Sequence, residues 1–220
     1  MQGMIRCGLL AGLLVACNPS DPATPDAPPI DGDGAAGLHV TWASEPSSYP
    51  GTIEDWLTVD SVTLTVESLK VIGDAGPGDP RTTKAVFQLR WDDHDSPQAI
   101  DFADAPTGLY SKVALQLDGH TLLPSLEIKG HVVLAGATVE YEVEDRNAVP
   151  VSLDCDRMLP PGGSAAIALT LRLHDALTSV DYESLPVHDG RIELETGNSQ
   201  LDDFVDKFSR AFSVDNSGPH

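Results

Sequence analysis

The chain has few basic residues, few cysteines and no long apolar run, and each shortage excludes a class of protein. Thirteen Lys and Arg stand against 34 Asp and Glu in 220 residues, a net charge of −21. This balance argues against nucleic-acid binding and against electrostatic attachment to an anionic membrane, because both depend on Lys and Arg. Three cysteines are too few for a disulfide scaffold. No apolar run reaches the roughly 18 residues of a membrane span. The length fits one globular domain with appended segments.

Residues 1–17 have the pattern of a secretion signal. A single charged residue precedes an apolar stretch from Cys7 to Ala16, about the length of a signal hydrophobic region. The segment ends in Leu14-Val15-Ala16-Cys17, which resembles a bacterial lipobox, where the cysteine is acylated. Asn18 after it resembles the sorting signal of outer-membrane lipoproteins in Gram-negative bacteria. We expect several acyl chains on Cys17, since one chain binds membranes only marginally; an ordinary signal with an incidental cysteine is the alternative.

Residues 18–37 form a proline-rich segment. Pro19, Pro22, Pro25 and Pro28 are spaced by three, the repeat of a polyproline II helix. At ~3.1 Å per residue, such a tether would hold a domain up to about 60 Å from the membrane. A peptide ligand for a proline-recognition domain is the alternative, and we favour the tether.

Residues 38–214 alternate apolar and polar residues, which is typical of strands with one buried face. About eight to ten such runs, separated by Gly- and Pro-containing turns, predict an all-β fold, an antiparallel sandwich. The alternation of Val62, Leu64 and Val66 resumes out of phase at Leu69, which predicts a bulge near Glu67–Ser68. Residues 215–220 are expected to be a tail.

Two segments have helical spacing. Leu201, Phe204, Val205, Phe208 and Phe212 predict a C-terminal helix over 199–212, begun by Ser199, that closes one end of the sandwich. Lys207 and Arg210 in its second half suit the helix dipole. A shorter candidate covers 175–185.

The segment Phe102–Val113 resembles the turn-to-strand motif of secreted β-sandwich domains, in which a Gly permits the turn and a Tyr ring packs beneath it. Here these residues are Gly108 and Tyr110. Together with segments 62–69, 171–181 and 190–194, it is similar to an uncharacterised bacterial lipoprotein family. The resemblance implies a prealbumin- or immunoglobulin-like sandwich and an envelope location, with no agreed activity. A periplasmic copper-binding sandwich family is a more distant likeness, and its metal ligands have no counterpart here.

The acidic run after Trp91 is the candidate metal site. Asp92, Asp93 and Asp95 follow a predicted strand, and Asp101 lies nearby in the sequence. Oxygen-rich loops suit Ca²⁺, so a calcium-dependent or other metal-dependent binding module is one hypothesis. A solvated acidic loop without a metal is the favoured alternative. Glu140, Glu142 and Glu144 are expected on the wet face of one strand.

Catalytic motifs are scarce: the sequence contains no nucleophile elbow, zinc-protease motif, phosphate loop or dinucleotide fingerprint. An envelope hydrolase is therefore kept only as an alternative. Cys155 lies between Asp154 and Asp156, whose charges disfavour a thiolate. We expect a structural thiol there, with intermolecular pairing as the alternative.

Glycan binding needs exposed aromatic platforms, and aromatic residues make up only 5% of the chain. Tyr49 and Trp56, in one loop, are the two expected to be free; a packed connection is the alternative. The sequence thus favours a non-enzymatic, lipid-anchored envelope protein with a binding or structural role. Its partners would be the membrane, through the anchor, and an envelope protein or glycan.

Overall fold

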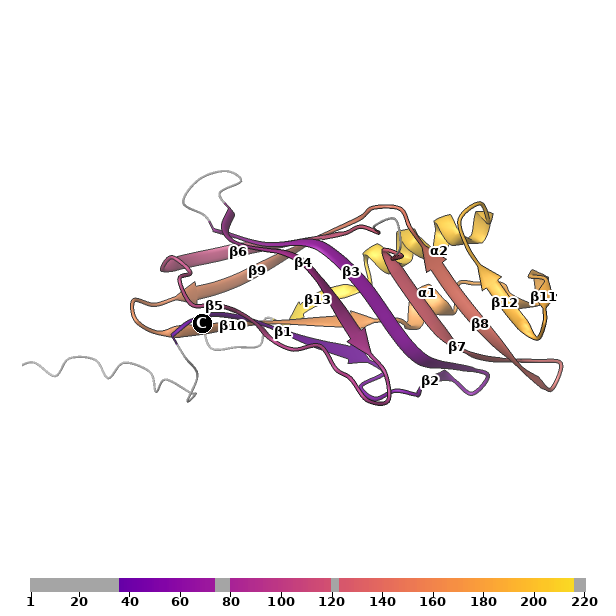
Figure 1. Cartoon of the computed structure of the whole chain (residues 1–220). Coiled ribbons are helices and arrows are strands. Elements are labelled where there is room, and N and C mark those ends of the chain that lie inside the picture. The colour runs from indigo at the N-terminus through magenta and orange to yellow at the C-terminus, as the bar shows by residue number, and fades with distance from the viewer. Residues whose placement is uncertain (1–35, 74–79, 120–122, 216–220) are drawn as a thin grey trace, which may run out of the picture. The chain divides into compact units, whose positions relative to one another are not determined.

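The computed structural model describes residues 36–73, 80–119 and 123–215. The predicted signal, Cys17, the tether up to residue 35 and the end of the tail lie outside the described residues. Within them, thirteen strands form two sheets, accompanied by two α-helices and one 3-10 turn (Figure 1). The expected mostly-β, sandwich-like fold with a short C-terminal helix is confirmed.

The smaller sheet has the strand order β13-β10-β1-β5. Its strands are β1 (Gly37–Glu45), β5 (Ile100–Phe102), β10 (Ser164–Arg172) and β13 (Phe212–Asp215). Strands β1 and β10 pair in parallel over nine residues, and β8 and β12 of the larger sheet are also parallel. The expectation of an antiparallel sandwich is therefore corrected to one of mixed sheets.

The larger sheet is organised by the long strand β3, Leu57–Gly73. Along one edge β3 pairs first with β7 and then with β6, and along the other with β2 and β4. Strand β6 continues to β9, and β7 continues to β8, β12 and β11. The bounds are β2 (Gly51–Glu54), β4 (Pro80–Trp91), β6 (Gly108–Leu117), β7 (Leu126–Leu134), β8 (Ala137–Asp145), β9 (Val149–Leu159), β11 (Val187–His188) and β12 (Arg191–Leu194).

Two bulges shift the buried face of β3. The register against β6 slips between Val66 and Ser68, which confirms the predicted bulge near Glu67–Ser68. A second slip against β7 lies between Val59 and Ser61. Because each extra residue reverses the alternation, the chain can change partner strands along β3 and keep its apolar side chains in the core.

The turn before β6 has the geometry expected from its sequence. Gly108 adopts φ 127°, a value that L side chains rarely adopt. Tyr110 is fully buried, and its hydroxyl donates to the Pro106 carbonyl oxygen at 2.6 Å. This arrangement matches the tyrosine corner of Greek-key sandwiches, which ties a strand to the connection before it.

The helices are shorter than predicted. Helix α2 spans Ser199–Ser209, and Asn198 caps it by accepting from the Gln200 amide at 3.0 Å, so Ser199 is its first residue and not its cap. Phe212 belongs to β13 instead. The candidate at 175–185 is α1 (His174–Leu177) followed by the 3-10 turn η1 (Tyr182–Ser184). No helix among the described residues is long and apolar enough to cross a membrane.

The core lies between the larger sheet and two different covers (Figure 1). The smaller sheet covers the part with β4, where the Trp42 and Phe87 rings lie 6.2 Å apart. The α1–η1–α2 segment covers the part with β7 and β8, where Tyr182 packs on Tyr141 at 5.3 Å. The smaller sheet and the helical segment therefore cover neighbouring parts of the larger sheet, and a boundary lies where these two covers meet.

Candidate functional site

A groove lies at that boundary, where the end of β10 meets α1 and the turn from α2 into β13. Two backbone hydrogen bonds fix the junction. The Arg172 amide donates to the Ala211 carbonyl at 2.8 Å, and the Leu173 amide donates to the Glu45 carbonyl at 3.2 Å. Main-chain hydrogen bonds therefore hold the segments that form the groove walls together.

The groove has a volume of about 850 Å³, within the range of small-molecule sites. Phe212, which is buried, and the half-buried Ala211 supply its apolar part. Thr178 and Ser179 also line it, but their hydroxyls donate to main-chain carbonyls of α1. Their oxygens are therefore left to act as acceptors.

The charged part of the groove is mixed: the carboxylates of Glu45 and Asp175 line it together with three basic side chains, those of Arg172, Lys207 and Arg210. The basic residues are three of the chain's 13 Lys and Arg. The Arg172 Nε lies 3.2 Å from a Glu45 oxygen, and Arg210 pairs with Asp206 one helical turn away. Both pairs are exposed to solvent, and such pairs contribute little. For Lys207, no ion pair occurs among the described residues.

His174 stands on the groove wall between two carboxylates. Its Nε2 lies 2.7 Å from Glu54 of β2, and its Nδ1 lies 3.0 Å from Asp175. Both partners accept hydrogen bonds, so the pair of contacts favours the doubly protonated ring. The hydrogen bonds to Asp175 and Glu54 raise the pKa of His174.

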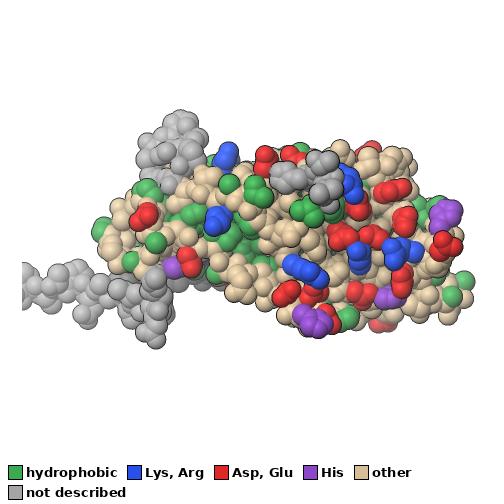
Figure 2. All heavy atoms as spheres, in the orientation of Figure 1, with side chains coloured by type: hydrophobic (Ala, Val, Ile, Leu, Met, Phe, Trp, Pro, Cys, Tyr) green, Lys and Arg blue, Asp and Glu red, His purple; other side chains and the backbone are tan. Residues whose placement is uncertain are grey.

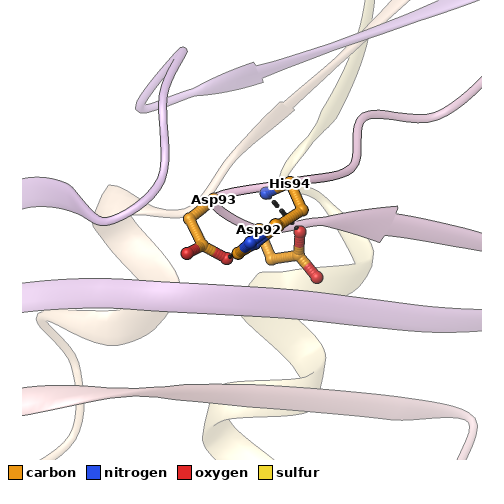
Figure 3. Close-up of side chains that lie close together, drawn as sticks. All are labelled: Asp92, Asp93 and His94. Atoms are coloured by element: carbon orange, nitrogen blue, oxygen red, sulfur yellow. Dashed lines mark hydrogen bonds and ion pairs between the residues drawn. The ribbon is translucent and has the colours of Figure 1, made fainter.

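The predicted metal residues are only partly brought together. Oxygen and nitrogen atoms of Asp92, Asp93 and His94 lie within 4.8 Å of one another, as Figure 3 shows. Asp101 is instead on β5, where it accepts from His39 at 2.7 Å. Asp95 and Asp101 both line a different hollow, beside β4.

The carboxylate of Asp92 is already satisfied by the chain. One oxygen accepts the amides of His94 and Asp95 at 2.8 and 2.7 Å, and the other accepts from Arg90 at 2.5 Å. These hydrogen bonds, the amide of His94 foremost, lower the pKa of Asp92. His94 pairs with Asp93, and that hydrogen bond raises the pKa of His94. The geometry is that of a closed turn, in which a cation would compete with Arg90 for the second oxygen of Asp92.

The Glu residues of β8 lie on the wet face of the sheet, as expected. Figure 2 shows acidic and basic side chains intermingled over β7 and β8. Lys129 lies 2.5 Å from Glu127 and 3.4 Å from Glu142, and Arg191 lies 2.9 Å from Glu142. Burial is the largest single influence on Glu127 and raises its pKa, but the hydrogen bonds with Lys129 and Glu142 and the charges of Lys129 and Arg90 together outweigh burial, so the pKa is lowered. The face is thus a network of ion pairs.

One pair on this face bears on the hydrolase alternative. The His131 Nδ1 lies 2.7 Å from an Asp60 oxygen, and Ser61 lines the same hollow of about 240 Å³. Among the described residues no hydrogen bond joins Ser61 to His131. The pair therefore lacks the activated nucleophile that a triad requires.

The two loop aromatics differ in exposure. Tyr49 is only 9% exposed, so the expectation that it is free is corrected: its ring belongs to the core. Burial raises the pKa of its hydroxyl. Trp56 is 38% exposed, and one edge packs on Tyr182 with centroids 6.1 Å apart. Cys155 is buried, and its thiol donates to the Tyr110 carbonyl at 3.4 Å.

Sequence reasoning missed the groove because its walls come from three separate segments of the chain: Glu45, residues 172–179 and residues 207–213. Lys207 and Arg210 are explained by the helix dipole alone when α2 is considered in isolation. A signal was nonetheless present: basic residues are scarce in this chain, and two of them lie three positions apart near the C-terminus. Their proximity to Arg172 depends on β13 pairing with β10.

Comparison of the chain with known proteins gives no match to a family model, to a curated protein or to a solved structure.

Proposed function

We propose that the protein is a lipid-anchored component of the bacterial cell envelope with a non-catalytic binding role. The observation that carries the binding role is the groove between α1, α2, β10 and β13. It combines an apolar surface with three cationic side chains, which outnumber the two carboxylates of its lining, in a strongly acidic chain. The lipobox-like end at Cys17 and the proline-rich segment after it support the anchored location.

The anchor and the location are tested with the full chain in a Gram-negative host. Metabolic labelling with a fatty-acid analogue should mark the wild-type protein and not Cys17→Ala, and fractionation should place only the wild type with the outer membrane. Labelling of the Cys17→Ala protein, or recovery of an unlabelled wild type from the soluble fraction, would contradict the anchor.

The binding role is tested by crosslinking in intact cells. A photoreactive residue at Thr178, on the groove wall, should give a discrete adduct with an envelope molecule. The same residue at Lys70, an exposed position of β3 outside the groove, serves as the matched control. Equal adducts at both positions, or none at Thr178, would argue against the groove as the binding site.

A metal-dependent binding module is the second candidate, supported by the proximity of Asp92, Asp93 and His94. The groove is favoured because its cations have only exposed partners or none among the described residues. The carboxylate of Asp92, by contrast, is filled by the chain's own donors.

A further inference from the structure

The ligand class of the groove follows from the charges that line it. We infer that the groove binds a small organic anion, a carboxylate or phosphate group carried on an apolar body. Arg172, Lys207 and Arg210 would contact the charged group, and the surface of Ala211 and Phe212 would contact the apolar body. This inference rests on the proposed binding role and goes beyond it by naming the chemistry of the ligand.

Basic residues are scarce in this chain. The chain carries 34 acidic residues and 13 Lys and Arg, so an anion is repelled from most of the molecule. Three of those 13 cations line one groove, and the two carboxylates that also line it are paired, Glu45 with Arg172 and Asp175 with His174. Arginine presents planar donors that match carboxylate and phosphate oxygens, and lysine binds them as a point charge.

The cations can turn toward a ligand at little cost. The side chains of Arg172 and Arg210 are 58% and 72% exposed, and those of their carboxylate partners are 61% and 59% exposed. Exposed pairs stabilise by about 0–1 kcal/mol. Lys207 is exposed and makes no ion pair within the described part of the chain. His174 is different, because both of its ring nitrogens already face carboxylates.

The apolar part of the groove determines the chemistry of the uncharged part of the ligand. Phe212 is 4% exposed and packs edge-on against Phe208 at 5.7 Å, so it is a fixed surface. Hydroxyls that could donate to the ligand are committed to backbone carbonyls. An acyl or alkyl segment fits the apolar part of the groove, because its burial there removes apolar area from water.

A structural role for Lys207 and Arg210, in offsetting the partial negative charge at the C-terminal end of α2, makes a different prediction. Under that role the two side chains affect the stability of the fold and leave binding unchanged. The test therefore measures binding and folding separately.

The experiment is a calorimetric titration of the full chain with hexyl phosphate, hexanoate, inorganic phosphate and the neutral hexanol. We expect one of the two hexyl anions to bind, and which one binds identifies the charged group of the ligand as a phosphate or a carboxylate. Hexanol should bind at least about tenfold more weakly than that anion. Inorganic phosphate should bind more weakly than hexyl phosphate. Raising NaCl from about 50 to about 500 mM should weaken binding, because the charges are exposed.

Two variants locate the site. Lys207→Glu with Arg210→Glu should weaken binding at least about tenfold, whereas Lys70→Glu, a single reversal outside the groove, should change it by less than about twofold. Lys207→Gln with Arg210→Gln gives the same test without reversing charge. Circular dichroism melts of each variant show that it is folded.

The inference is overturned if hexanol binds as tightly as the anions, if Lys70→Glu is as damaging as the groove variants, or if no anion binds at about 10 mM. These results are distinguishable from failure of the proposed function. Crosslinking from Thr178 without anion binding retains the binding role and removes this ligand class. Anion binding by a protein that is neither acylated nor crosslinked in the envelope would retain this ligand class and remove the proposed role in the envelope.

Discussion

At the scale of single residues, the hydroxyl of Tyr110 is the clearest determinant of the fold. It donates to the Pro106 carbonyl from a fully buried ring. Tyr110→Phe leaves that carbonyl without its donor, and we expect a loss of about 1–3 kcal/mol in the free energy of unfolding. Urea denaturation measures it.

Tyr182→Phe is the matched control. The Tyr182 hydroxyl is buried without a hydrogen-bond partner in the described structure, and burial alone raises its pKa. Removing this hydroxyl should leave stability unchanged or slightly higher. Equal losses from the two variants would show that the Tyr110 hydrogen bond is not the cause.

Gly130 of β7 is a second position where a change of one atom should alter the free energy of unfolding. A Cβ there would lie 2.1 Å from the Thr58 carbonyl oxygen and 2.7 Å from the Tyr141 hydroxyl. Gly130→Ala forces β3 and β7 apart, and we expect a cost of about 3 kcal/mol, also measured by urea denaturation. Gly136→Ala, in the turn after β7, meets no atom within 4 Å but has φ 84°, so about 1 kcal/mol of backbone strain is expected. A larger loss at Gly136 would contradict this account.

At the scale of elements, periodicity predicts the strands but not their partners. The slip in alternation at Glu67 is visible in the sequence because a bulge is a local event. The parallel pairing of β1 with β10 is not visible in the sequence, because most of the domain's residues lie between these two strands along the chain. Phe212 fits a helical spacing and lies in β13, since pairing with β10 overrides the local pattern. The groove was missed for the same reason, as it exists only where distant segments meet.

The loop after β4 gives a prediction about metal. Because Arg90 and two amides already occupy the Asp92 carboxylate, we expect the thermal midpoint of the full chain to be the same in EDTA and in millimolar Ca²⁺. A cation that bound only the native state at a hundredfold excess over its dissociation constant would add about 2.7 kcal/mol. A saturable rise, abolished by Asp92→Asn, would contradict the closed turn and establish a metal site.

His174 joins β2 to α1 and gives a dependence on pH. Its folded-state pKa is raised by Asp175 and Glu54, so its contribution is complete below the unfolded value, near 6.5, and is lost as pH rises through the folded pKa. We expect the free energy of unfolding of His174→Gln to match the wild type at pH 8.5 and to be lower at pH 5.5. His188→Gln, an exposed histidine of β11, is the control. An equal deficit at both pH values would mean that the ring acts by packing alone.

At the scale of the whole molecule, the net charge of −21 acts against the folded state, because compaction brings like charges closer. Salt screens this repulsion over a Debye length of about 30 Å at 0.01 M and about 10 Å at 0.1 M. We therefore expect the thermal midpoint of the full chain to rise between these two concentrations of NaCl.

The surface ion pairs oppose this trend, since salt also screens attractions such as those of Lys129 with Glu127 and Glu142. Lys129→Gln removes these attractions and makes the net charge more negative, so its midpoint should rise more steeply with salt than that of the wild type. A wild-type midpoint that falls with salt would mean that the ion-pair network outweighs the net repulsion. Salt should have the opposite effect on the groove, where it should weaken the binding of hexyl anions. If salt raises the thermal midpoint and lowers the affinity for hexyl anions in the same protein, the groove is a local cationic site within an acidic surface.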